Sequence, residues 1–273
     1  MPIDEPRADN LANWDERVAG HIEGYRIDRY VSDPAHMSSV VMFDRQRLGD
    51  LNGMKVLHLQ CHIASDTITL ARLGAEVTGI DFAPSAIAAA RNLFARTGTP
   101  GRFIESELYD APATLDEQFD MVYTGVGAIN WLPDIEGWAG VVDHFVKPGG
   151  RLFMTEGHPV AWALDQERDD RLLVLASPYF EGRMETWEEE HSYLGDATLT
   201  NTKSHEWNHG LGEILSALLS RGFVIKLFEE HRVLPWRMHQ WMEEFEPEWF
   251  RFPADVADQV PLMYTLVAEK ALN

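Results

Sequence analysis

The sequence predicts an α/β fold, in which helices cover a doubly wound, mostly parallel sheet of seven strands. Strand-like apolar runs alternate with amphipathic helical patterns from residue 55 to residue 155. Two of the helical patterns end at a glycine, Gly74 and Gly98, which is a common helix stop. The last two strand-like runs, 223–228 and 262–268, have no strong helical pattern between them. That change of rhythm indicates an antiparallel final strand.

Each expected element has a local reason in the sequence. The strands are short runs rich in apolar and β-branched residues, over 55–59, 76–81, 102–106, 119–124, 151–155, 223–228 and 262–268. The helices repeat apolar residues every three or four positions, over 66–73, 84–97, 138–146 and 211–219. Pro84 suits the first turn of the second helix, and the turn KPGG precedes the fifth strand.

The chain is expected to form one domain over residues 1–273. Residues 1–50 show helical spacing of apolar residues and are interpreted as a helical lid, and residues 51–156 as a cofactor-binding core. Two stretches, 157–207 and 232–260, depart from the alternating rhythm and hold six of the nine tryptophans. They are interpreted as acceptor-side cover segments over the ligand edge of the sheet, or alternatively as plain hydrophobic covers.

The charge of the chain restricts its partners. With a formal net charge of −21 and scattered basic residues, the protein is expected to bind neither nucleic acid nor an anionic membrane surface. A small neutral or cationic partner fits better, although surface carboxylates also simply confer solubility. The single cysteine, the polar start MPIDEPRADN and the lack of an apolar run of about 18 residues favour a cytoplasmic protein.

The stretch VLHLQCHIASDTI, residues 56–68, has the pattern of a cofactor-binding strand, loop and helix, yet its loop contains no glycine. Glycine matters most where a pyrophosphate approaches the helix, so its absence argues against NAD or FAD. Asp81 follows Gln60 at about the 20-residue spacing at which an acidic side chain reaches a ribose, although it could instead cap the next helix. The pattern therefore favours a phosphate-free nucleoside such as S-adenosylmethionine.

Several ordered segments together resemble the class I S-adenosylmethionine-dependent methyltransferases, over roughly residues 14 to 270. These segments are VTGIDFAP, FIESELYDAP, FDMVYTGVGAINWLPDI, VKPGGRLFMTEGHP and EWNHGLGEILSALLSRGF. In place of the usual acidic residue and glycine-rich turn, the first motif has His58, Gln60, His62 and Ala64. It is similar to a bacterial branch with LHLQCH and DT, in which the position of Ala64 is often glycine.

The resemblance implies a Rossmann-like sheet and a set of cofactor-binding residues. Gln60, Cys61 and His62 are expected to line the methionine end of the cofactor, and Asp81 and Phe82 the ribose. The other positions it implies are Glu107 and Leu108 beside adenine, and Thr124, Gly125 and Val126 beneath the sulfonium. Tyr25 in the lid is expected either to reach the cofactor carboxylate or to pack only.

The expected reaction is an in-line methyl transfer to a small aromatic or heteroaromatic acceptor, with no metal. Candidates for a general base are Glu156, His158 and His209, each of which could instead cap a helix or bond the backbone. Trp131, Trp187, Trp236 and Trp241 are expected to bind the acceptor, because indole rings stack on planar molecules. An alternative for the tryptophans is that they only anchor the cover segments.

Three other functions are consistent with parts of the sequence. HEWNH, residues 205–209, fits the zinc-protease pattern H-E-x-x-H, but Asn208 and the glycines near His209 suit a helix cap better than a continuous helix. Cys61 beside His62 could suggest a nucleophile and its base, but neighbouring strand residues point apart. A non-catalytic nucleoside binder is the remaining alternative, because the first motif is altered.

Overall fold

The computed structural model describes residues 3–180, 182–192, 194 and 198–272. Its main sheet has seven strands in the order β3-β2-β1-β4-β5-β12-β8. They are β1 Lys55–Leu59, β2 Glu76–Asp81, β3 Arg102–Glu105, β4 Phe119–Thr124, β5 Val146–Gly157, β8 Phe223–His231 and β12 Met263–Lys270. Strand β12 runs antiparallel to both β5 and β8, whereas β1 to β5 pair in parallel. The predicted fold class, including the antiparallel last strand, is confirmed.

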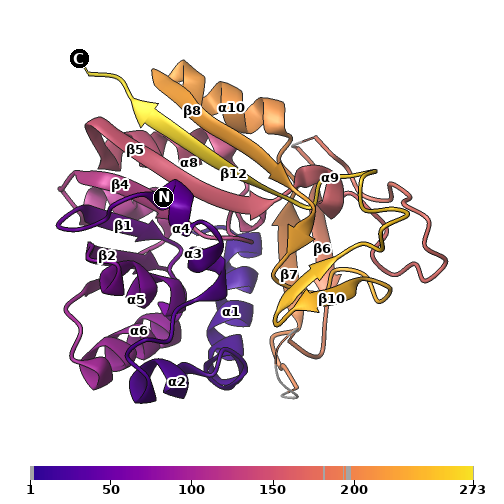
Figure 1. The fold of residues 1–273 in the computed structure, drawn as a ribbon, viewed down its shortest axis with the longest axis horizontal. Coiled ribbons are helices and arrows are strands. Elements are labelled where there is room, and N and C mark those ends of the chain that lie inside the picture. The colour runs from indigo at the N-terminus through magenta and orange to yellow at the C-terminus, as the bar shows by residue number, and fades with distance from the viewer. Residues whose placement is uncertain (1–2, 181, 193, 195–197, 273) are drawn as a thin grey trace.

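Helices cover both faces of this sheet (Figure 1). One layer contains α5 Ser65–Arg72 and α6 Pro84–Thr97, and the other α7 Ala111–Thr114, α8 Ile135–Phe145 and α10 Leu211–Ser220. Successive strand residues enter opposite layers, so that Val56 packs with the first and Leu57 with the second. Both side chains are fully buried, which explains why β1 reads as a continuous apolar run.

Two boundaries differ from the prediction for local reasons. Helix α8 begins at Ile135 rather than at residue 138, because the Asp134 side chain accepts a hydrogen bond from the Gly137 N–H at 2.9 Å and caps the helix. Strand β5 begins at Val146, which pairs with Phe119, so the KPGG turn lies inside the strand as an irregularity.

The N-terminal region is helical, with α1 Glu5–Gly24, α2 Ile27–Ser32, α3 Ser39–Phe43 and α4 Arg45–Leu48. Helix α1 is the longest of these and runs between α6 and the ribbon formed by β6 Met184–Glu188 and β7 Lys203–Trp207 (Figure 1). Val18 faces the core, whereas Ile22 is exposed. The helix therefore lies beside the edge of the sheet where β1 and β2 end.

Two segments outside the sheet pack on each other. The first holds α9 Pro159–Trp162 and the β6–β7 ribbon, and the second a small sheet of β9 Val233–Leu234, β10 Glu243–Glu246 and β11 Trp249–Arg251. Ala161 and Leu164 from the first share an apolar cluster with Leu234 and Phe252 from the second. The strands of these segments were not predicted, because most side chains of β6 and β10 are exposed and show no apolar alternation.

Candidate active site

The candidate site lies where the order of the strands reverses, between β1 and β4. A small pocket at the carboxyl ends of these strands is lined by six of the residues expected from the sequence: Gln60, Asp81, Phe82, Glu107, Leu108 and Trp131. Arg7 and Asn10 of α1 close it from the other side. The structure thus brings together residues from four separate sequence motifs.

The loop after β1 keeps a glycine-like backbone without glycine. Gln60, His62 and Ala64 have φ values of 54°, 48° and 65°, so every second residue is left-handed. Such a conformation costs a non-glycine residue roughly 1–2 kcal/mol. Residues in rare backbone conformations cluster at functional sites, because the surrounding structure must hold them there. The loop therefore has the geometry of a glycine-rich turn at the positions where the sequence lacks glycine.

Hydrogen bonds hold this loop against β2 and against the segment that follows β4. The Cys61 N–H donates to the Ile80 carbonyl at 2.9 Å, and the Gln60 amide Nε2 donates to the Ala128 carbonyl at 2.9 Å. The Cys61 side chain points into the core, where a Cβ on Gly79 would lie only 2.7 Å from its sulfur. Burial raises the pKa of the Cys61 thiol, so this side chain is a core residue and not a nucleophile.

Asp81 joins the loop to the end of β2. Its Oδ2 accepts a hydrogen bond from the His62 N–H at 2.8 Å, and its Oδ1 accepts one from the Ala83 N–H at 3.0 Å. Burial raises the pKa of this carboxyl to about 6, although the backbone donors oppose the shift. Each carboxylate oxygen has two lone pairs, so Asp81 can hold the loop, begin α6 and still accept a ligand hydroxyl.

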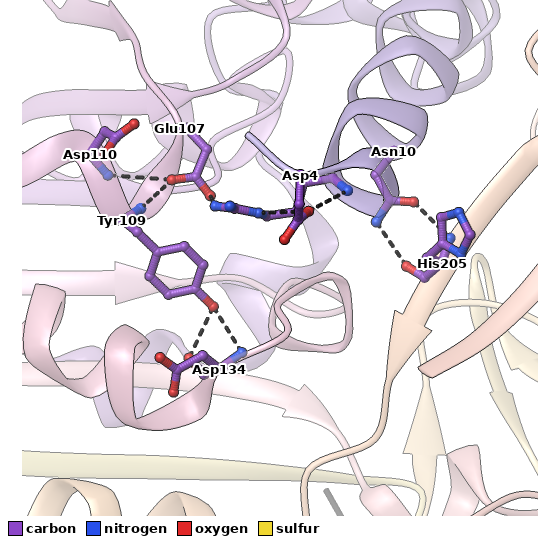
Figure 2. A network of polar contacts seen from close by, with 8 residues as sticks. Asp4, Asn10, Glu107, Tyr109, Asp110, Asp134 and His205 are labelled. Atoms are coloured by element: carbon purple, nitrogen blue, oxygen red, sulfur yellow. Dashed lines mark hydrogen bonds and ion pairs between the residues drawn. The ribbon is translucent and has the colours of Figure 1, made fainter. Parts of the chain in front are cut away.

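Glu107, after β3, is held by its own loop and by α1. Its carboxylate accepts hydrogen bonds from the Tyr109 N–H at 2.7 Å and the Asp110 N–H at 3.3 Å. It also forms an ion pair with Arg7 at 3.0 Å. Figure 2 shows this network beside a second contact of α1, in which the Asn10 side chain bonds the His205 backbone. Helix α1 is therefore fastened at both sides of the pocket.

Several buried polar atoms at this edge have no hydrogen-bond partner within the described part of the chain. They are Gln60 Oε1, Thr124 Oγ1, Asn130 Oδ1 and Trp14 Nε1. Gln60 directly follows β1 and Thr124 is the last residue of β4. Asn130 lies in the short turn Ile129–Trp131 that comes after β4. Because buried polar groups are normally paired, such a gathering indicates a site that a polar ligand completes.

Aromatic rings of α1 rest on the loop and on the turn after β4. The Trp14 ring meets the Trp131 ring at 5.1 Å and the His62 ring at 5.4 Å, in both cases edge to face. The His21 Nδ1 lies 3.3 Å from the His62 Nε2. Tyr25 lies beside His62, with their ring centroids 6.2 Å apart. The side chain of His62 therefore points toward the lid, whereas its backbone faces Asp81.

The three base candidates are engaged in internal hydrogen bonds. The Glu156 carboxylate accepts from the N–H groups of residues 127–129 and of Gly157, at 2.5–3.0 Å. His158 accepts from the Val160 N–H at Nδ1, and its Nε2 lies 2.9 Å from Glu230. The Nε2 of His209 donates to the Leu132 carbonyl at 2.7 Å. The contacts of Glu156 and His209 therefore hold the chain around the pocket residues Trp131 and Leu132, whereas that of His158 joins the start of α9 to β8.

The tryptophans expected to bind the acceptor do not lie together. Trp131 lines the pocket, whereas Trp236 stacks on Trp162 at 5.5 Å. Trp241 stacks on Phe252 at 4.6 Å within the apolar cluster of the cover segments. Trp187 lies on β6 and is 45% exposed. For Trp236 and Trp241 the contacts match the alternative of anchoring the cover segments. Gly125 lies at the end of β4, and Val126 packs against the cover cluster.

The HEWNH segment is not a helix. His205, Glu206 and Trp207 belong to β7, and the His205 Nε2 lies 3.0 Å from Asp9. Throughout the described ranges, no group of three or more histidine, cysteine or acidic side chains could hold a metal ion. Asn208 does not cap α10 as expected: its amide donates to the carbonyls of Pro159 and Pro178.

The cap of α10 is formed two residues later than predicted. The Gly210 N–H donates to the Glu213 side chain at 2.6 Å, and Gly210 occupies the cap position. Asparagine is a good helix cap, but the Asn208 side chain instead ties two cover loops together.

Five residues near the site were not found from the sequence: Arg7, Trp14, Asp66, Asn130 and Glu206. Two of them, Arg7 and Trp14, belong to α1, and Glu206 belongs to the β6–β7 ribbon. No local sequence pattern predicts how these elements pack against the rest of the fold. Burial and the neighbouring Glu189 raise the pKa of Glu206 to about 7, while Asn130 hydrogen-bonds to it. Asp66 belongs to the DT pair of the first motif, so a signal for it was present.

Comparison with known proteins agrees with this geometry. Residues 57–152 match the profile of the methyltransferase domain family. The ubiquinone biosynthesis O-methyltransferase of Proteus mirabilis is 31% identical over 111 residues, which are 41% of this chain and 45% of that protein. The chain thus spans about half the length of the curated relatives it matches. None of the helices within the described residues is long and apolar enough to cross a membrane.

Solved structures extend the similarity of fold over most of the chain. An S-adenosylmethionine-dependent methyltransferase from Clostridium acetobutylicum aligns with a TM-score of 0.62 at 11% identity, covering 93% of this chain and 99% of that one. The glycopeptide N-methyltransferase MtfA in complex with S-adenosyl-L-homocysteine aligns with a TM-score of 0.54 at 18% identity, covering 86% and 91%. Residues 57–152 therefore match the methyltransferase domain family, and most of the chain shares the fold of these solved methyltransferases.

Proposed function

We propose that the protein transfers the methyl group of S-adenosylmethionine to a small aromatic or heteroaromatic acceptor. One observation carries the proposal: the His62 N–H donates to Asp81 Oδ2 at 2.8 Å, so the left-handed loop and the acidic end of β2 form one unit. This unit lies at the switch point of the sheet, where α/β folds bind their ligands.

The residues present fit a nucleoside cofactor without phosphate. Asp81 offers carboxylate lone pairs to a ribose, and Glu107 and Leu108 line the same pocket for an adenine ring. Gln60 Oε1 and Thr124 Oγ1, for which the described residues offer no hydrogen-bond partner, are available to a ligand at the ends of β1 and β4. The family match and the cofactor named for MtfA and other fold neighbours further support S-adenosylmethionine.

Bound S-adenosylmethionine would supply an electrophilic methyl group on a sulfonium. The chain's own task is then to align the acceptor with that methyl group and to exclude water, because in-line transfer depends mainly on orientation. Trp131 presents a rigid ring at the pocket, and the Trp14 ring supports it edge to face at 5.1 Å. Such rings suit a planar acceptor. The curated relatives' role in ubiquinone biosynthesis also supports a small-molecule acceptor.

Where the acceptor must lose a proton, we assign the general base to Glu206. Its partner Asn130 directly precedes the pocket residue Trp131, and the turn they share packs against β7. The charged groups that influence Glu206 are Glu189 and Glu185 of the ribbon region and Arg17 of α1. A carboxyl that titrates near neutral pH is suited to proton transfer, whereas Glu156, His158 and His209 hold loops in place.

The test is an assay of methyl incorporation from labelled S-adenosylmethionine into phenols, indoles, aliphatic amines and carboxylic acids. We expect the best acceptors to be aromatic, and Trp131→Ala to raise their KM. Trp187→Ala, on the exposed ribbon, serves as the matched control and should leave KM unchanged. Aliphatic acids as best acceptors would overturn the aromatic proposal. Cofactor binding without transfer to any acceptor would favour a non-catalytic binder.

The role of Glu206 has its own readout. Glu206→Gln should lower kcat for acceptors that lose a proton and remove the rise of kcat near pH 7, since glutamine cannot accept a proton. An unchanged pH profile in this variant would exclude Glu206 as the base.

A further inference from the structure

Asp66, the second residue of α5, lies beneath the end of β4. Its Oδ1 accepts a hydrogen bond from the Ser38 hydroxyl at 2.5 Å. Its Oδ2 is directed toward Gly125, since a Cβ built on that glycine would lie 3.4 Å from the oxygen. The His58 Nε2 lies 3.6 Å from the same point. A carboxylate oxygen and an imidazole nitrogen therefore meet the backbone of β4 at the switch point.

This carboxylate has no cationic partner. None of the lysines and arginines that the structure describes forms an ion pair with Asp66, and its hydrogen bond comes from a neutral hydroxyl. Burial raises the pKa of Asp66. Burial also raises the pKa of Tyr30 and Tyr123, and the nearby Asp66 charge adds to that rise. A half-buried carboxylate without a counter-charge is costly to keep ionised, so a cation would stabilise this site.

The first motif explains why a charge is needed here. His58 stands where class I methyltransferase sequences usually have an acidic residue in β1. Burial lowers the pKa of His58 to about 3, so the imidazole is neutral and brings no charge to the end of the strand. Its Nδ1 bonds the Thr67 hydroxyl at 2.8 Å, which ties the strand to the start of α5. The bond between His58 and Thr67 thus fixes the turn that carries Asp66.

We propose that the Asp66 carboxylate is the anionic partner of the α-ammonium group at the methionine end of the cofactor. This inference rests on the proposed function and names the residue that replaces the missing acidic side chain of β1. Ser38 holds one oxygen of the Asp66 carboxylate by a hydrogen bond. The other oxygen is left directed toward Gly125. The buried Tyr123 hydroxyl, which lacks a partner among the described residues, is a further polar group nearby. A favourable first-turn charge on α5 is the alternative role for Asp66.

The experiment compares three ligands by calorimetry on the wild type and on Asp66→Asn. The ligands are S-adenosylhomocysteine, its analogue with a keto group in place of the amine, and 5′-methylthioadenosine, which lacks the amino-acid end. We expect Asp66→Asn to weaken S-adenosylhomocysteine by at least about tenfold, as for a lost charge-assisted hydrogen bond. The other two ligands should change by less than about twofold in the variant, because neither carries the ammonium group.

Asp116→Asn, at an exposed carboxylate outside the site, is the matched control and should change none of the three affinities. The inference is overturned if Asp66→Asn binds S-adenosylhomocysteine like the wild type, or if it weakens all three ligands equally. Failure of the wild type to bind S-adenosylhomocysteine or 5′-methylthioadenosine would instead overturn the proposed function. The two failures are therefore distinguishable.

A second measurement needs no variant. On the wild type, the affinity ratio of S-adenosylhomocysteine to its keto analogue should fall as acid protonates Asp66. Asp81 affects both ligands through the ribose they share, so the ratio isolates the ammonium site. The groups that face Asp66 are Ser38 before α3, Tyr30 of α2, His58 of β1 and Tyr123 of β4. A ratio that stays constant down to the pH at which the protein unfolds would contradict the proposal.

Discussion

At the scale of single residues, the loop after β1 keeps its left-handed backbone conformation although it contains no glycine. Ala64 is left-handed and fully buried, so two effects oppose each other when it is replaced by glycine. Relief of strain is worth about 1–2 kcal/mol. The lost methyl costs about 0.8 kcal/mol, and the freer unfolded chain costs a further 0.4–1 kcal/mol or so. We expect Ala64→Gly to leave the free energy of unfolding within about 1 kcal/mol of the wild type.

Valine at the same position should behave differently. A β-branched residue is a true outlier at positive φ, and residue 64 is fully buried, where added methyl groups tend to overpack the core, so we expect Ala64→Val to cost at least about 2 kcal/mol. Chemical denaturation measures both variants. Ala88→Val on the exposed face of α6 is the control and should cost less than about 1 kcal/mol. A well-tolerated valine at position 64 would show that the loop is not left-handed there.

Glu206 gives a stability signature as well as a proposed role. Its pKa is raised from 4.5 to about 7, chiefly by burial and then by Glu189. Because the folded state holds the proton more tightly, the contribution of Glu206 to stability is present below the unfolded pKa and is lost as the pH rises through about 7.

Glu206→Gln should therefore match the wild type near pH 4.5 and exceed its free energy of unfolding above pH 7, by on the order of 2–3 kcal/mol. Denaturant titrations across this pH range measure the difference. Glu188→Gln, an exposed residue of β6, should show no such pH dependence. The raised pKa is refuted if the two variants follow the same curve.

At the scale of elements, the docking of α1 sets access to the pocket. Asn10 is buried and exchanges two hydrogen bonds with the His205 backbone, at 2.7 and 2.8 Å (Figure 2). Asn10→Ala would leave a buried N–H and C=O of β7 unpaired, each worth about 1–3 kcal/mol. We expect faster hydrogen exchange in α1 and faster dissociation of S-adenosylhomocysteine in a stopped-flow experiment. Asn92→Ala, exposed on α6, is the control. If α1 in Asn10→Ala exchanges as slowly as in the wild type, this bond does not fasten the lid.

The helices and strands also show which parts of the fold can be predicted from local sequence patterns. Strands β1, β2 and β4 and helix α6 were placed from their patterns because they are buried on one or both faces. Strands β6 and β10 are not predicted because most of their side chains are exposed, and β7 is not predicted because its buried side chains include the polar Ser204 and His205. The start of α8 was missed because its cap, Asp134, precedes the apolar pattern by several residues. Local patterns report burial, and exposed strands leave no such pattern.

At the scale of the whole molecule, the sequence predicted the sheet and the cofactor edge better than the acceptor side. Asp81 and Gln60 were found because their spacing follows from the geometry of a βαβ unit. Trp14 and Glu206 depend on the docking of α1 and the ribbon, which are contacts between distant parts of the chain. The tryptophan count of the cover segments suggested a pocket, but Trp236 and Trp241 pack within the cover cluster. Composition alone cannot separate a lining residue from an anchoring one.

The central claim is that the carboxyl edge of β1, β2 and β4 binds S-adenosylmethionine. Its most direct test is calorimetric titration of the protein with S-adenosylhomocysteine and with NAD at pH 7.5, on the wild type and on Asp81→Asn. We expect one S-adenosylhomocysteine per chain, no measurable NAD binding, and an affinity at least about tenfold weaker in a folded Asp81→Asn protein, because the amide offers a ribose one acceptor oxygen in place of two. NAD binding as tight as that of S-adenosylhomocysteine, or an undiminished affinity in the variant, would contradict this account.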